Sequence, residues 1–337
     1  MEMLYGWMPL IYTAIIGIGI FMYVWMDGFD LGVGILFNAA PTEEDRDILM
    51  NSIAPVWDGN ETWLVLGGGA LLVAFPMAYS ILMPAFYIPL TIMLLGLIFR
   101  GVAFEFRFKA TRAKRFWNLA FGIGSLTAAI AQGMVLGAYV GGIEVADGRF
   151  AGGAFDWVTP LAVVTGCAVA CGYTLLGATW TAMKTEGALQ DWAFAIARRM
   201  CLGVVIFMAV VSIGTAFTRR EIADLWFSWP NVALLAPVPI TAAIAAAMLV
   251  RAVMQRREIA PFVLTLVLFA LGYLGLGISL WPTIIPPDID IWQAAGDPGA
   301  QGFLLVGVVF LLPCILGYTA LTYWIFRGKV RADGGYH

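Results

Sequence analysis

Nine long apolar segments constrain the fold of this chain more than any other feature. A helix needs about 20 apolar residues, at 1.5 Å rise each, to cross the hydrocarbon core of a bilayer. Hydrophobic residues make up 61% of the 337 residues and charged residues only 12%, whereas a soluble domain carries about 25% charged residues. The sequence predicts an all-α polytopic membrane protein with a single integral membrane domain over residues 1–337. The expected spans are 8–38, 50–79, 81–99, 117–141, 158–183, 200–217, 231–250, 261–281 and 303–326.

Basic residues predict the orientation of these spans. Of the 19 lysines and arginines, all except Arg149, Arg219 and Arg220 fall in the odd-numbered connections or the C-terminal tail. Because cytoplasmic connections carry the excess of basic residues, we expect the N-terminus outside and the C-terminus in the cytoplasm. Pro76, Ser80 and Pro84 predict a tight external turn between the second and third spans. The net charge of -3 does not favour binding to the negatively charged backbone of nucleic acid.

The single histidine, His337, is the last residue of the sequence. Haem, zinc and copper sites usually need imidazole ligands, and one terminal side chain does not supply a buried site. We therefore expect no metal centre and no His-ligated cofactor in this chain, and no catalytic residue of its own.

The first candidate site is an acidic pair near the cytoplasmic end of the first span. Asp27 and Asp30 stand three residues apart, so they share one helix face. Acidic side chains at membrane depth are costly and need a reason. The pair either lines a polar path for protons or marks a helix end where both carboxylates reach interfacial water. Gly28, Gly32 and Gly34 predict close helix contact in the same segment.

The second candidate pair is Asp58 and Glu61, which also share a helix face. If residues 47–58 form one helix, Asp58 lies on the order of 16 Å beyond Asp47 and inside the membrane. A carboxylate in a low-dielectric environment tends to take up a proton, so either group is a candidate relay. The alternative is a structural carboxylate held by Asn60, Thr62 or a tryptophan N–H.

A third motif, Phe99–Arg107, ends the third span. Arg100 and Glu105 are expected either to pair with each other or to contact a partner subunit. The alternative is that they anchor the helix at the headgroups.

Several motifs resemble subunit II of the cytochrome bd family of bacterial quinol oxidases. They are Asp27-Gly-Phe-Asp30-Leu-Gly-Val-Gly34, Asn51-Ser-Ile-Ala-Pro-Val-Trp-Asp-Gly-Asn60-Glu-Thr-Trp63, Phe99-Arg-Gly101, Phe104-Glu-Phe-Arg107, Ile291-Trp-Gln-Ala-Ala295 and Tyr318-Thr-Ala-Leu-Thr-Tyr-Trp324. The likeness covers nearly the whole chain. The segment Trp281-Pro-Thr-Ile-Ile-Pro-Pro287 resembles the cyanide-insensitive branch.

This resemblance implies a complex that oxidises quinol and reduces dioxygen to water. Haem b and haem d would lie in subunit I, and this chain would fold as two four-helix bundles plus one peripheral helix. The resemblance gives Asp58 a place on a cytoplasmic proton path and Trp63 a place beside the oxygen route, and it allows a structural quinone. The implied partners are subunit I, quinol, dioxygen and lipid in the bacterial plasma (inner) membrane, with a small single-helix subunit as a further candidate.

A proton-coupled membrane transporter is the alternative function. In that case Asp27, Asp30, Asp58 and Glu61 would bind substrate or protons near the midplane of the membrane. Co-purification with a haem-bearing partner distinguishes the two functions.

Overall fold

The computed structural model describes residues 2–330, so His337 lies outside the described residues. Within that range the chain is almost entirely helical, with two short antiparallel hairpins in the connections. The elements are α1 (Glu2–Phe37), α2 (Glu43–Ile53), α3 (Trp57–Ala74), α4 (Pro76–Ala85), α5 (Tyr87–Arg107), α6 (Lys114–Gly141), β1 (Val145–Ala146), β2 (Arg149–Phe150), α7 (Pro160–Lys184), α8 (Gly187–Thr218), α9 (Arg220–Phe227), α10 (Asn231–Leu235), α11 (Pro237–Met254), α12 (Ala260–Leu280), β3 (Thr283–Ile285), β4 (Ile289–Asp290) and α13 (Pro298–Ile325).

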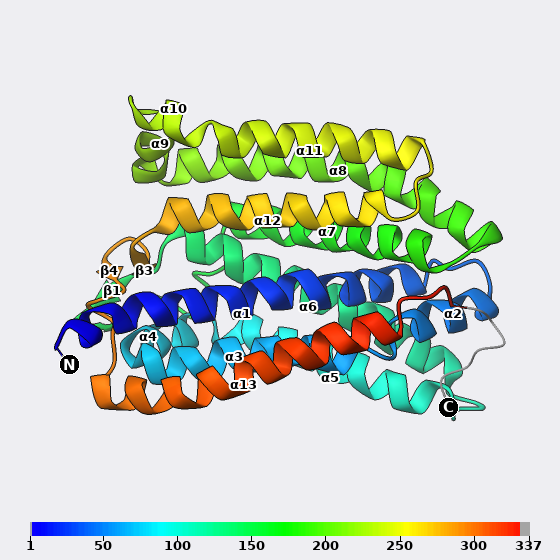
Figure 1. The fold of residues 1–337 in the computed structure, drawn as a ribbon, viewed down its shortest axis with the longest axis horizontal. Helices are drawn as coiled ribbons and strands as arrows, with labels where there is room; N and C mark the ends of the chain where they lie inside the picture. The colour runs from blue at the N-terminus through cyan, green and yellow to red at the C-terminus, as the bar shows by residue number, and fades with distance from the viewer. Residues whose placement is uncertain (1, 331–337) are drawn as a thin grey trace.

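The long helices form two adjoining groups of four, as expected (Figure 1). Helices α1, α3, α5 and α6 pack together, and α7, α8, α11 and α12 form the second group. Helix α7 joins the groups because it packs against both α1 and α6. Helix α13 lies outside both groups and contacts α3 and α1. The prediction of two bundles plus one peripheral helix is confirmed.

Eight of the described helical segments are long and apolar enough to cross a membrane. They correspond to eight of the nine expected spans. The second expected span, 50–79, is the exception, because it contains the end of α2, all of α3 and the beginning of α4. Helices α3 and α4 together still return the chain from the α2 end of the bundle to the opposite end (Figure 1).

Two prolines explain the breaks in this segment. Pro55 lies between α2 and α3, and Pro76 is the first residue of α4. Proline lacks the N–H that would continue the backbone hydrogen bonds of a helix, so each proline separates two helices. Residues 47–58 therefore do not form one continuous helix, which was the condition for the depth expected of Asp58.

Helices α1 and α7 approach each other so closely that their backbones touch. A methyl group added at Gly32 would lie 1.8 Å from the backbone oxygen of Tyr173 and 2.7 Å from the nitrogen of Gly177. A side chain at Gly34 would meet Ser125 Oγ of α6 at 2.0 Å. The glycines of the first motif thus set the distance from α1 to its neighbours, as the sequence indicated.

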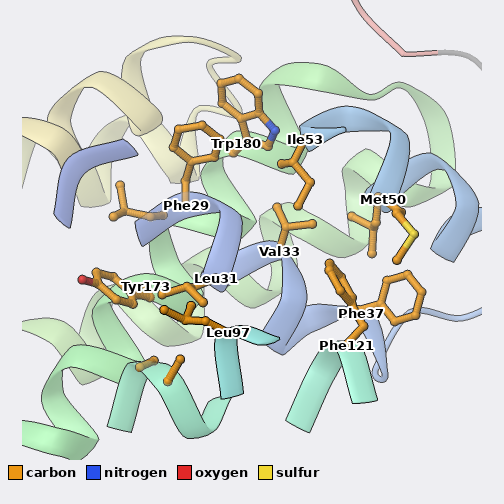
Figure 2. Packing of buried hydrophobic residues seen from close by; sticks show 14 of the residues in the cluster. Phe29, Leu31, Val33, Phe37, Met50, Ile53, Leu97, Phe121, Tyr173 and Trp180 are labelled. Carbon is orange, nitrogen blue, oxygen red and sulfur yellow. The ribbon is translucent and has the colours of Figure 1, made fainter. Parts of the chain in front are cut away.

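The largest apolar cluster surrounds the C-terminal half of α1 (Figure 2). Phe29 stacks on Trp180 of α7 with ring centroids 4.2 Å apart, and Phe37 meets Phe121 of α6 edge-on at 4.8 Å. Aromatic pairs of this geometry add about 0.5–1.5 kcal/mol each beyond their burial. These contacts fix the rotation of α1 and therefore the direction in which Asp27 and Asp30 point.

Candidate functional site

Three charged side chains, Asp27, Asp30 and Arg100, meet in the interior between α1 and α5. Arg100 Nη1 lies 2.8 Å from Asp27 Oδ1, and Arg100 Nη2 lies 3.9 Å from Asp30 Oδ2. All three side chains have zero solvent exposure. One guanidinium faces two carboxylates, so the second carboxylate has no counter-charge of its own in this cluster. Such a group is suited to gaining and losing a proton.

Helix periodicity explains how these residues come together. Asp27 and Asp30 share a face of α1, and each lies within about three turns of the end of that helix at Phe37. Arg100 lies two turns before Arg107, the last residue of α5, and both arginines are buried on the same face. The cluster is therefore about 10 Å from the helix ends near α2.

Asn60 and Tyr323 extend the cluster toward α3 and α13. Asn60 Nδ2 donates hydrogen bonds to Asp30 Oδ2 at 2.6 Å and to the backbone oxygen of Met26 at 3.4 Å. The hydroxyl of Tyr323 donates to Asn60 Oδ1 at 3.0 Å. The hydroxyl of Tyr23, one turn earlier in α1, lies close to Asp27. Four helices therefore contribute to one buried polar site.

The burial of the acidic pair bears on one of its two alternatives, and the role as a proton path stays a prediction. Full burial of Asp27 and Asp30 excludes the helix end at which carboxylates reach interfacial water. The ion pairs of Arg100 are with Asp27 and Asp30 of α1. Glu105 is exposed and makes no ion pair with Arg100. Pairing of Arg100 with Glu105 is therefore not the arrangement in this chain. Contact of Glu105 with a partner subunit stays a prediction.

Asp58 and Glu61 lie at the beginning of α3, next to the buried cluster. Asp58 is exposed, and its carboxylate makes no hydrogen bond or ion pair with residues in the described range. Glu61 is partly buried and close enough to interact electrostatically with Arg100 and Asp27. The alternative in which Asn60, Thr62 or a tryptophan N–H holds the Asp58 carboxylate is therefore not the arrangement among the described residues. Trp63 is 1% exposed and packs with Tyr23 and Met26.

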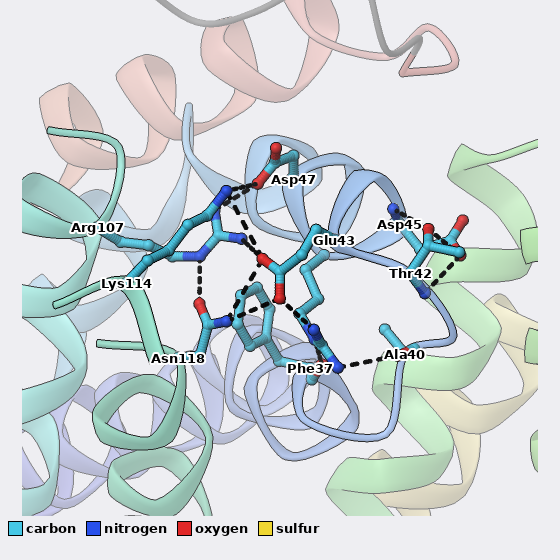
Figure 3. A network of polar contacts seen from close by, with 10 residues as sticks. Phe37, Ala40, Thr42, Glu43, Asp45, Asp47, Arg107, Lys114 and Asn118 are labelled. Carbon is cyan, nitrogen blue, oxygen red and sulfur yellow. Dashed lines mark hydrogen bonds and ion pairs between the residues drawn. The ribbon is translucent and has the colours of Figure 1, made fainter. Parts of the chain in front are cut away.

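A second polar network at the helix ends was not predicted from the sequence (Figure 3). Arg107 is fully buried, and its guanidinium contacts Asp47 at 2.5 Å, Asn118 at 2.6 Å and Glu43 at 3.3 Å. Burial raises the pKa of Glu43, but hydrogen bonds from Arg46 and Asn118 and the charge of Lys114 outweigh burial and lower that pKa below its ordinary value. The network ties α2 to α5 and α6.

Helix α2 begins at this network because Thr42 caps it. The Thr42 hydroxyl accepts a hydrogen bond from the Asp45 N–H, and the Asp45 side chain accepts one from the Thr42 N–H. This reciprocal capping box satisfies helix donors that would otherwise be unpaired. The spacing of Thr42 and Asp45 is the sequence signal that could have indicated where α2 begins.

No three His, Cys, Asp or Glu side chains in residues 2–330 come together as a metal site would require. The buried cluster has two carboxylates, but its third charged member is a guanidinium, which repels a cation. Its donor set fits proton binding and hydrogen bonding better than metal coordination.

Known proteins with similar sequences cover almost the whole chain. The cytochrome bd-I ubiquinol oxidase subunit 2 of Escherichia coli (strain K12) is 26% identical over 366 aligned residues, which span 98% of this chain and 97% of that protein. The cytochrome bd ubiquinol oxidase subunit 2 of Bacillus subtilis (strain 168) is 29% identical, with 95% of both chains covered.

The fold also matches a solved structure. A chain in the structure of bd oxidase from Geobacillus thermodenitrificans superposes with a TM-score of 0.72 at 19% identity, covering 96% of this chain and 99% of that chain. The sequence profile of the family described as cytochrome bd terminal oxidase subunit II matches residues 8–326. The chain therefore belongs to the cytochrome bd terminal oxidase subunit II family.

Proposed function

We propose that this chain stabilises a haem-bearing subunit I in a quinol-oxidising complex and conducts protons from the cytoplasm toward the site of dioxygen reduction. The observation that supports the proton role is the buried cluster of Asp27, Asp30 and Arg100. An uncompensated carboxylate in the membrane interior is costly, and a bound proton removes that cost. Asp30 is the member with the longer separation from Arg100 and therefore the candidate proton carrier.

Asp58 and Glu61 provide the approach to this carrier. Asp58 is exposed at the beginning of α3, and Glu61 stands one turn further along the same helix. Glu61 interacts electrostatically with both Asp58 and Asp27. A proton from water would bind Asp58, pass to Glu61 and then reach the Asp27–Asp30 pair. Each transfer moves one proton between carboxylates and leaves the donor ready to accept another.

The redox chemistry belongs to the partner in this proposal. Subunit I would hold haems b and d, which would supply electron transfer from quinol to dioxygen, and this chain's carboxylates would supply protons for water formation. The quinol substrate is supported by the names of the Escherichia coli and Bacillus subtilis relatives. The oxygen-access role of Trp63, a structural quinone and a small single-helix subunit stay predictions.

The proposed orientation places the α2 end of the bundle in the cytoplasm of a bacterial plasma membrane. The distribution of lysine and arginine supports it. In this orientation Asp58, the buried cluster and the Arg107 network all lie toward the cytoplasm, where a proton path for water formation must begin.

The stabilising role is tested by affinity purification of the tagged chain from its native membrane. We expect it to carry a haem-bearing partner and quinol oxidase activity, and we expect membranes lacking this chain to lose the haem absorbance of that partner. A partner that keeps its haem and activity without this chain would contradict stabilisation. A colourless preparation that transports solute would instead support the transporter.

A further inference from the structure

Helix α13 is peripheral, yet one of its side chains reaches the buried cluster. Among the described residues of α13 only Gln301 and Val308 are buried, and both lie in its first half. Near the other end, the hydroxyl of Tyr323 hydrogen-bonds to Asn60 Oδ1 at 3.0 Å. The Tyr323 ring meets Phe29 edge-on with centroids 6.3 Å apart. This end of α13 is thus attached through Tyr323.

The hydrogen bonds of Asn60 have a direction. A backbone oxygen only accepts, so the bond to Met26 O places the NH₂ group of Asn60 on the side of α1. The same NH₂ group donates to Asp30, and the amide oxygen faces Tyr323. In this orientation Asn60 donates to the carboxylate and favours its negative form. A rotated Asn60 would present its oxygen and favour the protonated form.

The segment after α13 is held by a tail clamp, which consists of Lys184, Glu258 and residues 326–330. Lys184 Nζ donates to the backbone oxygens of Phe326 and of Gly328, the latter at 2.9 Å. Lys329 Nζ lies 2.9 Å from Glu258 Oε1, and the N–H of Val330 donates to Lys184 O at 2.9 Å. The clamp connects the end of α13 to the α7–α8 junction through Lys184 and to the α11–α12 connection through Glu258. The end of α7 lies close to Tyr323, because the Trp180 and Tyr323 ring centroids are 6.4 Å apart.

We propose that Tyr323 is a positioning residue whose hydroxyl keeps Asn60 oriented toward Asp30, and that the tail clamp holds Tyr323 in place. This inference rests on the proposed proton role of Asp30. The other charged or titratable groups facing Asp30 are Asp27 on its own helix, Arg100 on α5 and Glu61 on α3. None of them changes when the Tyr323 hydroxyl is removed.

The test is the pH profile of oxygen consumption by the purified complex carrying Tyr323→Phe. The substitution keeps the ring and removes one hydrogen bond, so Asp30 should hold its proton more tightly. We expect the limb of the profile that depends on Asp30 to move to higher pH by about 0.5–1 unit. Tyr318→Phe is the matched control, because Tyr318 is 62% exposed on the same helix and its profile should stay unchanged.

Combining Tyr323→Phe with Asp30→Asn distinguishes a failure of this inference from a failure of the proton role of Asp30. Tyr323→Phe should shift the profile only when Asp30 is present. A wild-type profile for Tyr323→Phe, or an equal shift in the Asp30→Asn background, overturns the inference. Wild-type proton uptake in Asp30→Asn alone overturns the proton role instead. If Tyr323→Phe does not assemble, Lys184→Met loosens the same helix end, and an unchanged profile there counts against the inference.

Discussion

Replacing Arg100 with leucine is expected to destabilise the folded chain by about 3–5 kcal/mol. The guanidinium is the counter-charge for Asp27 at 2.8 Å and lies near Asp30, and all three groups are fully buried. Without Arg100, two carboxylates remain in the membrane interior with no positive partner. The measurements are the melting temperature and the haem content of the purified complex, and we expect both to fall strongly.

Two further variants test whether charge balance is the cause. Arg112→Leu removes an exposed arginine beyond the end of α5. This variant should keep the melting temperature and the haem content near their wild-type values. The combination of Arg100→Leu with Asp27→Asn and Asp30→Asn removes all three charges and should recover most of the stability. Wild-type stability of Arg100→Leu alone would show that the cluster does not depend on its ion pairs.

Replacing Gly32 with alanine is the second change with a large expected effect. The new methyl group would lie 1.8 Å from Tyr173 O, and the backbone atoms it meets belong to α7 and cannot rotate away. Helices α1 and α7 must separate, which costs about 3 kcal/mol and loosens the packing of Phe29 on Trp180. We expect a large loss of assembled complex, measured as yield and melting temperature after purification.

The matched control is Gly19→Ala on the same helix. Its nearest neighbours would be 3.7 Å away, which is ordinary contact. Alanine is favoured over glycine inside a helix by about 1 kcal/mol, so this variant should be as stable as the wild type or more stable. Equal behaviour of the Gly19 and Gly32 variants would contradict the close α1–α7 contact.

Most of the fold follows from the apolar segments, because each long run of apolar residues satisfies its backbone only as a helix in lipid. The exception is the second segment. Pro55 and Pro76 divide it, and Asp58, Asn60 and Glu61 make the beginning of α3 polar. The depth expected for Asp58 assumed one helix across Pro55, and that assumption is wrong.

The candidate site was only partly predictable. The spacing of Asp27 and Asp30 placed both carboxylates on one face, which is a local property of a helix. Their pairing with Arg100 depends on how α5 packs against α1, and no local pattern encodes that. The Tyr323–Asn60 contact joins residues 263 positions apart, and the Arg107–Asp47 contact joins residues 60 apart. Such contacts require the tertiary arrangement of the helices.

Proton uptake during oxygen reduction by the Asp30→Asn complex tests the central claim most directly. The variant leaves the Arg100–Asp27 pair intact and electrically balanced, so it should assemble with full haem content. Glu44→Gln, which changes an exposed carboxylate of α2, is the control for assembly and proton exchange at the surface. We predict that Asp30→Asn lowers the rate of proton uptake at least about 10-fold while Glu44→Gln does not. A fully assembled Asp30→Asn complex that takes up protons at the wild-type rate would contradict the proton path through this chain.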